Sequence, residues 1–113
     1  MDTKRVFGWI KQEPDDRDKK LFLAVRINPP SVDLRSKDTP IMDQSNCGSC
    51  TGNSSVADYD YEHVNEGFGD FRGSRLFVYY NARVLEHTTK EDAGAVLRDV
   101  LKTMGTGKKG KGV

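Results

Sequence analysis

The stretch that decides the fold is PIMDQSNCGSCTGN, residues 40–53, which holds both cysteines of the chain, Cys47 and Cys50. A C-x-x-C pair is compatible with a zinc site, a redox-active dithiol, a structural disulfide or a nucleophilic thiol. Zinc needs two further ligands, and His63 and His87 do not have ligand spacing. A thioredoxin-type dithiol follows a β-strand, whereas residues 33–40, DLRSKDTP, lack a strand pattern. A disulfide is unusual in a reducing compartment. The neighbouring residues favour the nucleophilic thiol.

A helix is predicted to begin at Cys50, because residues that start helices precede it. Asn46 and Ser49 are capping types, and Gly48 allows a tight turn before the helix. A thiol in the first turn of a helix lies at the positive end of the helix dipole, which favours the thiolate form. The N–H groups of that turn can stabilise an oxyanion, and a nearby glutamine amide, here Gln44, would add a second donor.

The spacing Q-x-x-C-G-S-C, from Gln44 to Cys50, resembles the signature of the papain-like cysteine peptidases, family C1, and above all of their bacterial and phage-type members. In that family the nucleophile opens a long helix and follows a glutamine at this distance. The resemblance implies that Cys50 is the nucleophile and that Gln44 and the Cys50 backbone N–H form the oxyanion hole. The alternative is that Gln44 is a solvated loop residue and Cys50 a small buried side chain.

The resemblance implies an α+β fold with two lobes, one helical and one similar to a β-barrel. The portion present is expected to be mainly α-helical, with three helices and an irregular N-terminal arm. We assign residues 1–30 to the arm and residues 31–113 to the helical, nucleophile-bearing lobe of an incomplete peptidase domain. Pro29 and Pro30 punctuate the boundary, and residues 31–35 are similar to the start of the mature domain in the family.

Capping residues and apolar periodicity predict the helices. The first covers residues 50 to about 66 and has a poor apolar face, the second follows Ser74 as its cap, and the third begins near Asp92. We expect the second helix to bury Leu76, Phe77, Tyr80 and Val84. The third is expected to bury a stripe of Ala93, Val96, Leu97, Val100, Leu101 and Met104.

Residues 91–94, Glu-Asp-Ala-Gly, are similar in position to a C-N-G-G loop that lines the substrate cleft in many members of the family. The resemblance implies that Gly94, with Ala93 beside it, binds the backbone of the substrate. Glu91 stands where the family has a cysteine that would bridge Cys47, so Cys47 is expected to have no disulfide partner in this chain.

A papain-like thiol needs an imidazole base oriented by an asparagine, and in the family these lie about 130–150 residues after the nucleophile. His63 is 13 residues after Cys50 on the same predicted helix, about 20 Å away, and His87 falls in a loop. We therefore expect a cysteine-type peptidase present as a fragment, without its catalytic histidine and asparagine and inactive alone. The alternatives are one subunit of a split peptidase, or a non-catalytic peptide- or protein-binding module derived from a peptidase lobe.

Net charge and the length of the apolar runs limit which classes of partner are expected. The 113 residues carry 18 basic and 17 acidic side chains, a net charge of +1, which gives no general reason to expect nucleic acid or an anionic membrane as partner. The longest apolar run, residues 21–25, is too short to span a bilayer, and no signal peptide is visible, so a cytoplasmic location is expected. The expected partners are a peptide or protein substrate and the missing C-terminal lobe, in cis or in trans. No cofactor and no metal are expected, and the Lys/Gly-rich residues 105–113 are expected to be a flexible terminus.

Overall fold

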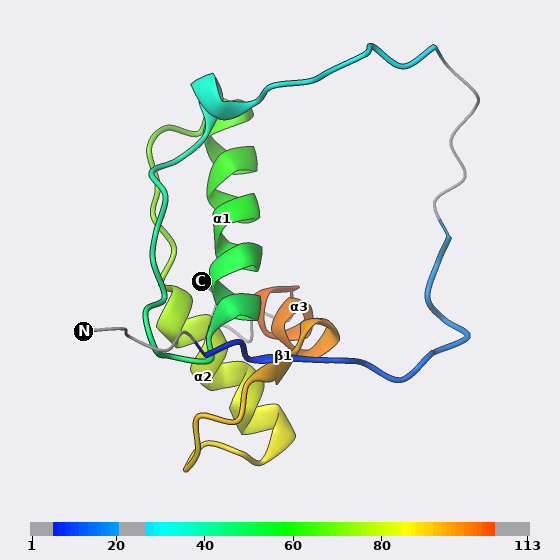
Figure 1. The fold of residues 1–113 in the computed structure, drawn as a ribbon, viewed down its shortest axis with the longest axis vertical. Helices are drawn as coiled ribbons and strands as arrows, with labels where there is room; N and C mark the ends of the chain where they lie inside the picture. Colours follow the sequence, from blue (N-terminus) through cyan, green and yellow to red (C-terminus); the bar gives the residue numbers. More distant parts are fainter. Residues whose placement is uncertain (1–5, 21–26, 106–113) are drawn as a thin grey trace.

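The computed structural model describes residues 6–20 and 27–105, with the helices gathered around one long helix and an extended arm beside them (Figure 1). In chain order the elements are β1 (Trp9–Ile10), a 3-10 turn η1 (Arg35–Lys37), α1 (Cys50–Asn65), α2 (Arg75–Glu86), β2 (Ala95–Val96) and α3 (Leu97–Gly105). The predicted three helices and mainly helical character are confirmed. Of the tail predicted to be flexible, residues 106–113 lie outside the described residues, as does the apolar run 21–25.

Helix α1 begins at Cys50, as predicted, with Ser49 in the cap position. The Ser49 side chain makes no capping bond to the helix; instead Asn53 Nδ2 donates to its Oγ at 2.8 Å. Gly52 lies where the next helix crosses, since a Cβ atom there would stand 2.9 Å from the Arg75 carbonyl oxygen. The absence of a side chain at Gly52 thus lets α2 pack directly on the first turns of α1.

Helix α2 is capped as predicted, because Ser74 Oγ accepts a hydrogen bond from Phe77 N at 3.3 Å. The predicted buried stripe is wrong. Leu76, Phe77, Tyr80 and Val84 are exposed, and the helix buries Val78, Tyr79 and Ala82. Apolar residues occur all around the first two turns of this helix, so periodicity did not identify the face that meets α1.

The predicted start of the third helix near Asp92 is also wrong, because α3 begins at Leu97. Gly94 has φ +76°, which an α-helix does not accommodate, and Ala95–Val96 form β2. This strand pairs in parallel with β1 of the arm, Trp9 opposite Ala95 and Ile10 opposite Val96. The long-range pairing with the arm outweighs the helical periodicity of these residues.

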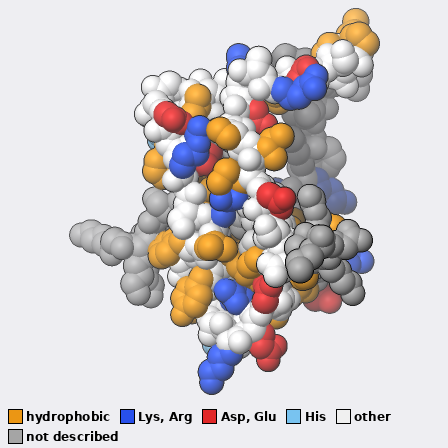
Figure 2. All heavy atoms as spheres, turned by 60° about the vertical axis from the view of Figure 1, so that its left-hand side comes forward, with side chains coloured by type: hydrophobic (Ala, Val, Ile, Leu, Met, Phe, Trp, Pro, Cys, Tyr) orange, Lys and Arg blue, Asp and Glu red, His pale blue; other side chains and the backbone are white. Residues whose placement is uncertain are grey.

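The buried core is small and lies where α1, α2, β2 and α3 meet. It consists of Val56, Val78, Tyr79, Ala82, Ala95 and Val100, with Cys47 and Met104 packed against it. Of the predicted third stripe, Val100 is buried, whereas Leu101 is 59% exposed. Figure 2 shows apolar side chains in separate groups among charged ones on one face. In the two described ranges, no helix is both long enough and apolar enough to cross a membrane.

Candidate active site

Cys50 is the first residue of α1 and is half-buried. Its thiol is free, as is that of Cys47. The first turn of α1 carries no acidic side chain, so nothing in that turn offsets the positive end of the helix dipole. The backbone turn that leads into Cys50 therefore places its thiol at the positive end of the α1 dipole.

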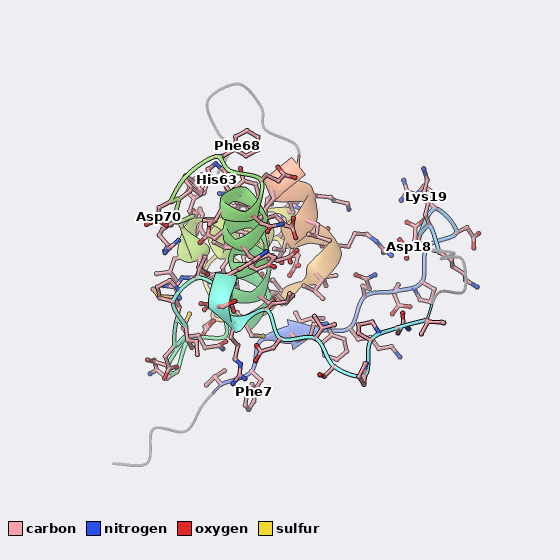
Figure 3. The ribbon with its side chains drawn as sticks, turned by 90° about the horizontal axis from the view of Figure 1, so that it is seen from above. Phe7, Asp18, Lys19, His63, Phe68 and Asp70 are labelled. Atoms are coloured by element: carbon pink, nitrogen blue, oxygen red, sulfur yellow. The ribbon has the colours of Figure 1, made fainter. Side chains whose placement is uncertain are left out.

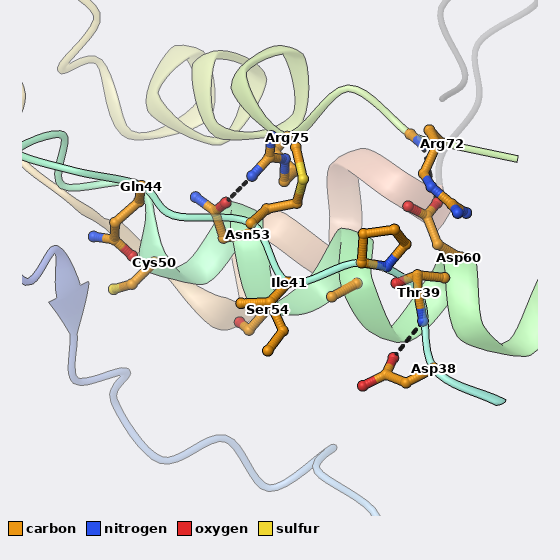
Figure 4. A pocket seen from close by; sticks show the side chains of 14 residues that line it. Asp38, Thr39, Ile41, Gln44, Cys50, Asn53, Ser54, Asp60, Arg72 and Arg75 are labelled. Carbon is orange, nitrogen blue, oxygen red and sulfur yellow. Dashed lines mark hydrogen bonds between the residues drawn. The ribbon is translucent and has the colours of Figure 1, made fainter. Parts of the chain in front are cut away.

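The structure brings Gln44 and Cys50 to the rim of one pocket (Figure 4). Gln44 Nε2 donates to the carbonyl oxygen of Cys47 at 2.8 Å and to that of Val6 at 2.9 Å. The first bond fixes the amide to the loop that precedes α1. The second engages the remaining amide hydrogen with the N-terminal arm, so an oxyanion would have to take the place of the Val6 carbonyl.

The pocket beside Cys50 has a volume of about 570 Å³ and runs along α1 between the helix and the preceding extended segment. Polar groups on its wall are tied to one another: Arg75 Nη1 donates to Asn53 Oδ1 at 2.7 Å, and Gly73 N donates to the buried carboxylate of Asp60 at 2.9 Å. Its lining comprises residues 38–42, Gln44, Cys50, Asn53, Ser54, Ala57, Asp60, Arg72, Gly73 and Arg75.

Gly94 lies across the arm from the loop that precedes α1, because Gly8 of the arm lies between Gly94 and Gly48 of that loop. Ala95 N donates to the Gly8 carbonyl oxygen at 2.8 Å. A Cβ atom on Gly8 would stand 1.7 Å from the Gly48 carbonyl oxygen, and one on Gly94 would stand 2.2 Å from that of Gly8. Ala93 is exposed. The backbone edge predicted to bind substrate is thus paired with an extended segment of the chain itself.

Sequence reasoning missed a polar cluster beside this edge, formed by Asp92 and Tyr79. Gly48 N donates to both carboxylate oxygens of Asp92, at 3.0 and 2.8 Å, and the Tyr79 hydroxyl also donates to Asp92. Gly94 N in turn donates to the Tyr79 hydroxyl at 3.1 Å. The position of Asp92, next to the residue that replaces the bridging cysteine, was the only signal in the sequence.

The electrostatics of the cluster follow from these contacts. Burial, reinforced by the hydrogen bond to Asp92, raises the pKa of Tyr79 to about 12. Hydrogen bonds from Tyr79, and then from the Gly48 backbone, lower the pKa of the Asp92 carboxyl. Asp92 is therefore an anion at neutral pH, and Tyr79 is a neutral donor.

No protein-family model matches the chain. An uncharacterized peptidase C1-like protein of Acanthamoeba polyphaga mimivirus is 35% identical over 127 residues, covering 92% of this chain and 41% of the viral protein. Among solved structures, xylellain, a cysteine protease from Xylella fastidiosa, matches with a TM-score of 0.76 and 34% identity, over 92% of this chain and 40% of xylellain. In sequence and in fold, the chain matches papain-like cysteine peptidases. It spans about two fifths of the length of both relatives, and its helices represent the helical part of the α+β papain-like fold.

Neither histidine of the described residues is placed as the base that a papain-like peptidase uses beside its cysteine. His63 lies near the far end of α1, where its ring packs against Phe68 and Phe71 with centroids 5.4 and 5.1 Å away. In the view of Figure 3, His63 and Phe68 lie on the opposite side of the helix from Phe7 of the arm. His87 occupies the C-cap of α2 with φ +59°. Within the described ranges, neither ring is hydrogen-bonded to Cys50.

Proposed function

We propose that this chain carries the nucleophile and the oxyanion hole of a peptide-hydrolysing cysteine peptidase. The Cys50 thiolate attacks the carbonyl carbon of a peptide bond, and the negative charge moves to the carbonyl oxygen. Gln44 Nε2 and the Cys50 N–H hold that oxygen until the C–N bond breaks. A proton from a general acid leaves with the amine, and water then hydrolyses the thioester. The observation that carries this proposal is Cys50 at the first position of α1 with the Gln44 amide at the same pocket rim.

The contacts of the arm are evidence that the substrate is a peptide or protein. Ala95 N donates a hydrogen bond to the Gly8 carbonyl oxygen, and β1 pairs with β2, so an extended backbone can pair with this edge. The carbonyl oxygen of Val6 accepts a hydrogen bond from Gln44 Nε2, which is the kind of contact that a substrate oxyanion requires. In the proposed reaction, a substrate backbone pairs near Gly94 and Ala93 in place of the arm.

The general base in this proposal is an imidazole other than His63. Thirteen residues of helix place His63 about 20 Å from Cys50, beyond the reach of proton transfer. We therefore expect the base and its orienting asparagine to be contributed by a further lobe, in the same polypeptide or in a second one. On this proposal, the 113-residue chain alone forms the thiol adduct but does not turn over peptides.

A non-catalytic peptide-binding module is the second candidate. It is favoured by the pairing of β2 with an extended segment in the absence of any described contact between Cys50 and a histidine. The two candidates differ in whether peptide binding requires the thiol. A binding module retains its affinity for extended peptides when Cys50 is replaced, whereas the proposed peptidase captures carbonyl groups through sulfur.

A peptide aldehyde tests the proposal without needing a base, because the thiol adds across the aldehyde to give a hemithioacetal whose oxygen lies in the oxyanion hole. The aldehyde should bind the chain and Cys47→Ala, the matched control for the other free thiol. Binding should be lost in Cys50→Ala and weakened about tenfold in Gln44→Ala, measured by calorimetry and intact mass. Equal binding to Cys50→Ala would transfer the assignment to the binding module.

A further inference from the structure

A single carboxylate joins the two loops that flank the candidate active site. Asp92 accepts two hydrogen bonds from Gly48 N, in the loop before α1. Through the Tyr79 hydroxyl it is also linked to Gly94 N, in the loop before β2. Both cysteines are free, so these hydrogen bonds, rather than a disulfide, connect the loops in the described part of the chain.

The fit between Asp92 and Gly48 is close. A Cβ atom on Gly48 would stand 2.9 Å from Asp92 Oδ1, so any larger residue would displace the carboxylate. Gly48 is buried and precedes Cys50 by only two residues. The backbone between them sets the direction of the Cys50 N–H and of its thiol. A carboxylate that fixes Gly48 therefore also restricts the groups proposed to attack and to hold the oxyanion.

The surroundings keep the carboxylate charged and oriented. Tyr79 and Gly48 donate to it, and Cys47 Sγ lies 3.9 Å from Oδ1. Arg83 stacks over the Tyr79 ring at 4.2 Å and donates to the Glu91 carbonyl oxygen at 2.6 Å, which ties down the residue before Asp92. The cluster is thus held from α2 as well as from the nucleophile loop.

We infer that Asp92 is a positioning residue of the active site, which fixes the Gly48–Cys50 turn directly and Gly94 through the Tyr79 hydroxyl. This inference rests on the proposed function for its meaning in catalysis. Displacements of about 1 Å in a reacting group can reduce rates about a hundredfold, so a residue that touches no substrate can still control the reaction. Asp92 touches the backbone of Gly48 and needs no contact with the substrate.

The test is Asp92→Asn in a Cys47→Ala background, so that only Cys50 reacts with iodoacetamide. Replacing the anion by an amide removes one acceptor for Gly48 N and keeps the size of the side chain. If Asp92 positions the turn, alkylation of Cys50 at pH 7 slows about tenfold, its pH profile moves to higher pH, and hydrogen exchange at the Gly48 amide, which donates to Asp92, rises about tenfold. Asp70→Asn, on an exposed loop, is the matched control and should change neither measurement.

A simple charge effect predicts the opposite sign, because removing a nearby anion favours the thiolate and speeds alkylation. Faster alkylation, or unchanged alkylation with unchanged exchange at the Gly48 amide, would overturn the inference. If Cys50 of the parent already reacts like an ordinary thiol, the proposed function fails, while the exchange comparison still decides whether Asp92 fixes the turn.

Tyr79→Phe provides a second variant that leaves the Asp92–Gly48 bonds in place. It should raise amide exchange at Gly94 about tenfold and leave exchange at Gly48 unchanged. Equal increases at both positions would mean that the two loops are not held separately, which contradicts the inference. This comparison decides the question even where Asp92→Asn does not fold.

Discussion

The two ends of α1 use glycine in opposite ways. At the Cys50 end, Gly8, Gly48 and Gly94 lie against one another or against Asp92, and an added Cβ atom would stand under 3.0 Å from a neighbouring atom at each. At the Asn65 end, Gly67 and Gly69 have φ values of +82° and +92° but nothing within 4 Å of an added Cβ atom. Contact therefore requires glycine at the first end, and backbone conformation alone favours it at the second.

The difference shows which end of α1 tolerates substitution and which does not. The Cys50 end is held by backbone pairs and by the Asp92–Tyr79 cluster, with the buried core beside it. The Asn65 end is held by ring contacts among Tyr59, His63 and Phe71 with exposed glycines around them. Substitutions should therefore be costly at the first end and mild at the second.

The largest effect is expected for Gly94→Ala. The new methyl group would meet the Gly8 carbonyl oxygen at 2.2 Å, and the residue would keep φ +76°. Steric overlap and left-handed backbone together should lower the free energy of unfolding by about 3 kcal/mol. Urea denaturation measures the loss, and amide exchange at Ala95 should reveal release of the arm. A loss below that of Gly69→Ala would contradict the comparison.

Tyr79→Phe should have the next largest effect. The variant keeps the buried ring but removes the hydroxyl that accepts from Gly94 N, which leaves a buried donor without its partner. The expected loss is about 2 kcal/mol in the free energy of unfolding, measured by urea denaturation at pH 7. Tyr59→Phe, at the exposed end of the helix, is the control and should change stability by no more than about 0.5 kcal/mol.

Gly69→Ala tests the Asn65 end of α1, where we expect a substitution to be mild. Its φ of +92° is unfavourable for alanine, but no atom opposes the methyl group. We expect a loss of about 1 kcal/mol, confined to the Asn65 end of α1. Hydrogen exchange should rise in residues 67–73 only. Changes that reach Gly48 or Cys50 would mean that the two ends are coupled more tightly than their contacts indicate.

The smallest expected effect is the loss of folding stability at low pH that results from protonation of Asp92. The pKa of Asp92 is lowered by its hydrogen bonds from Tyr79 and Gly48, so its contribution to stability is present above the unfolded value of about 3.9 and is lost as pH falls through the folded value. The parent should lose stability more steeply than Asp92→Asn below about pH 4. Acid titration of the unfolding free energy checks this, and parallel curves would argue against the ionised cluster.

Local sequence signals predicted the helix boundaries that are set by residues adjacent in the chain. The start of α1 at Cys50 and the cap at Ser74 follow from residues within one helical turn of each boundary. The start of α3 was misplaced, because Ala93 and Val96 fit a helical stripe, whereas Ala95 and Val96 pair with an arm far away in the sequence. The buried face of α2 was misassigned because apolar side chains occur all around its first two turns, so that periodicity could not distinguish the face with Val78 and Tyr79, which joins the core.

The candidate site divides in the same way. Gln44 and Cys50 both line one pocket, and the oxyanion hole that their spacing predicted stays a prediction. Two features depend on contacts across the fold: the hydrogen bond from Gln44 to Val6, and the bonds of the Asp92 cluster. No local sequence pattern predicts either of them. The catalytic roles of Cys50, Gln44 and Gly94 remain predictions that the variants above test.

The parallel pairing of Trp9 with Ala95 has a consequence for folding during synthesis. Its two partners stand near opposite ends of the described chain, so the arm leaves the ribosome long before β2 exists. At usual rates of translation the arm waits roughly 4 to 17 s for its partner strand. Helices α1 and α2, whose contacts are local, can form in that interval. Closure of the arm against the loop that precedes α1 is therefore among the last steps of folding, and in a nascent chain α1 is in place before Gly8 lies against Gly48.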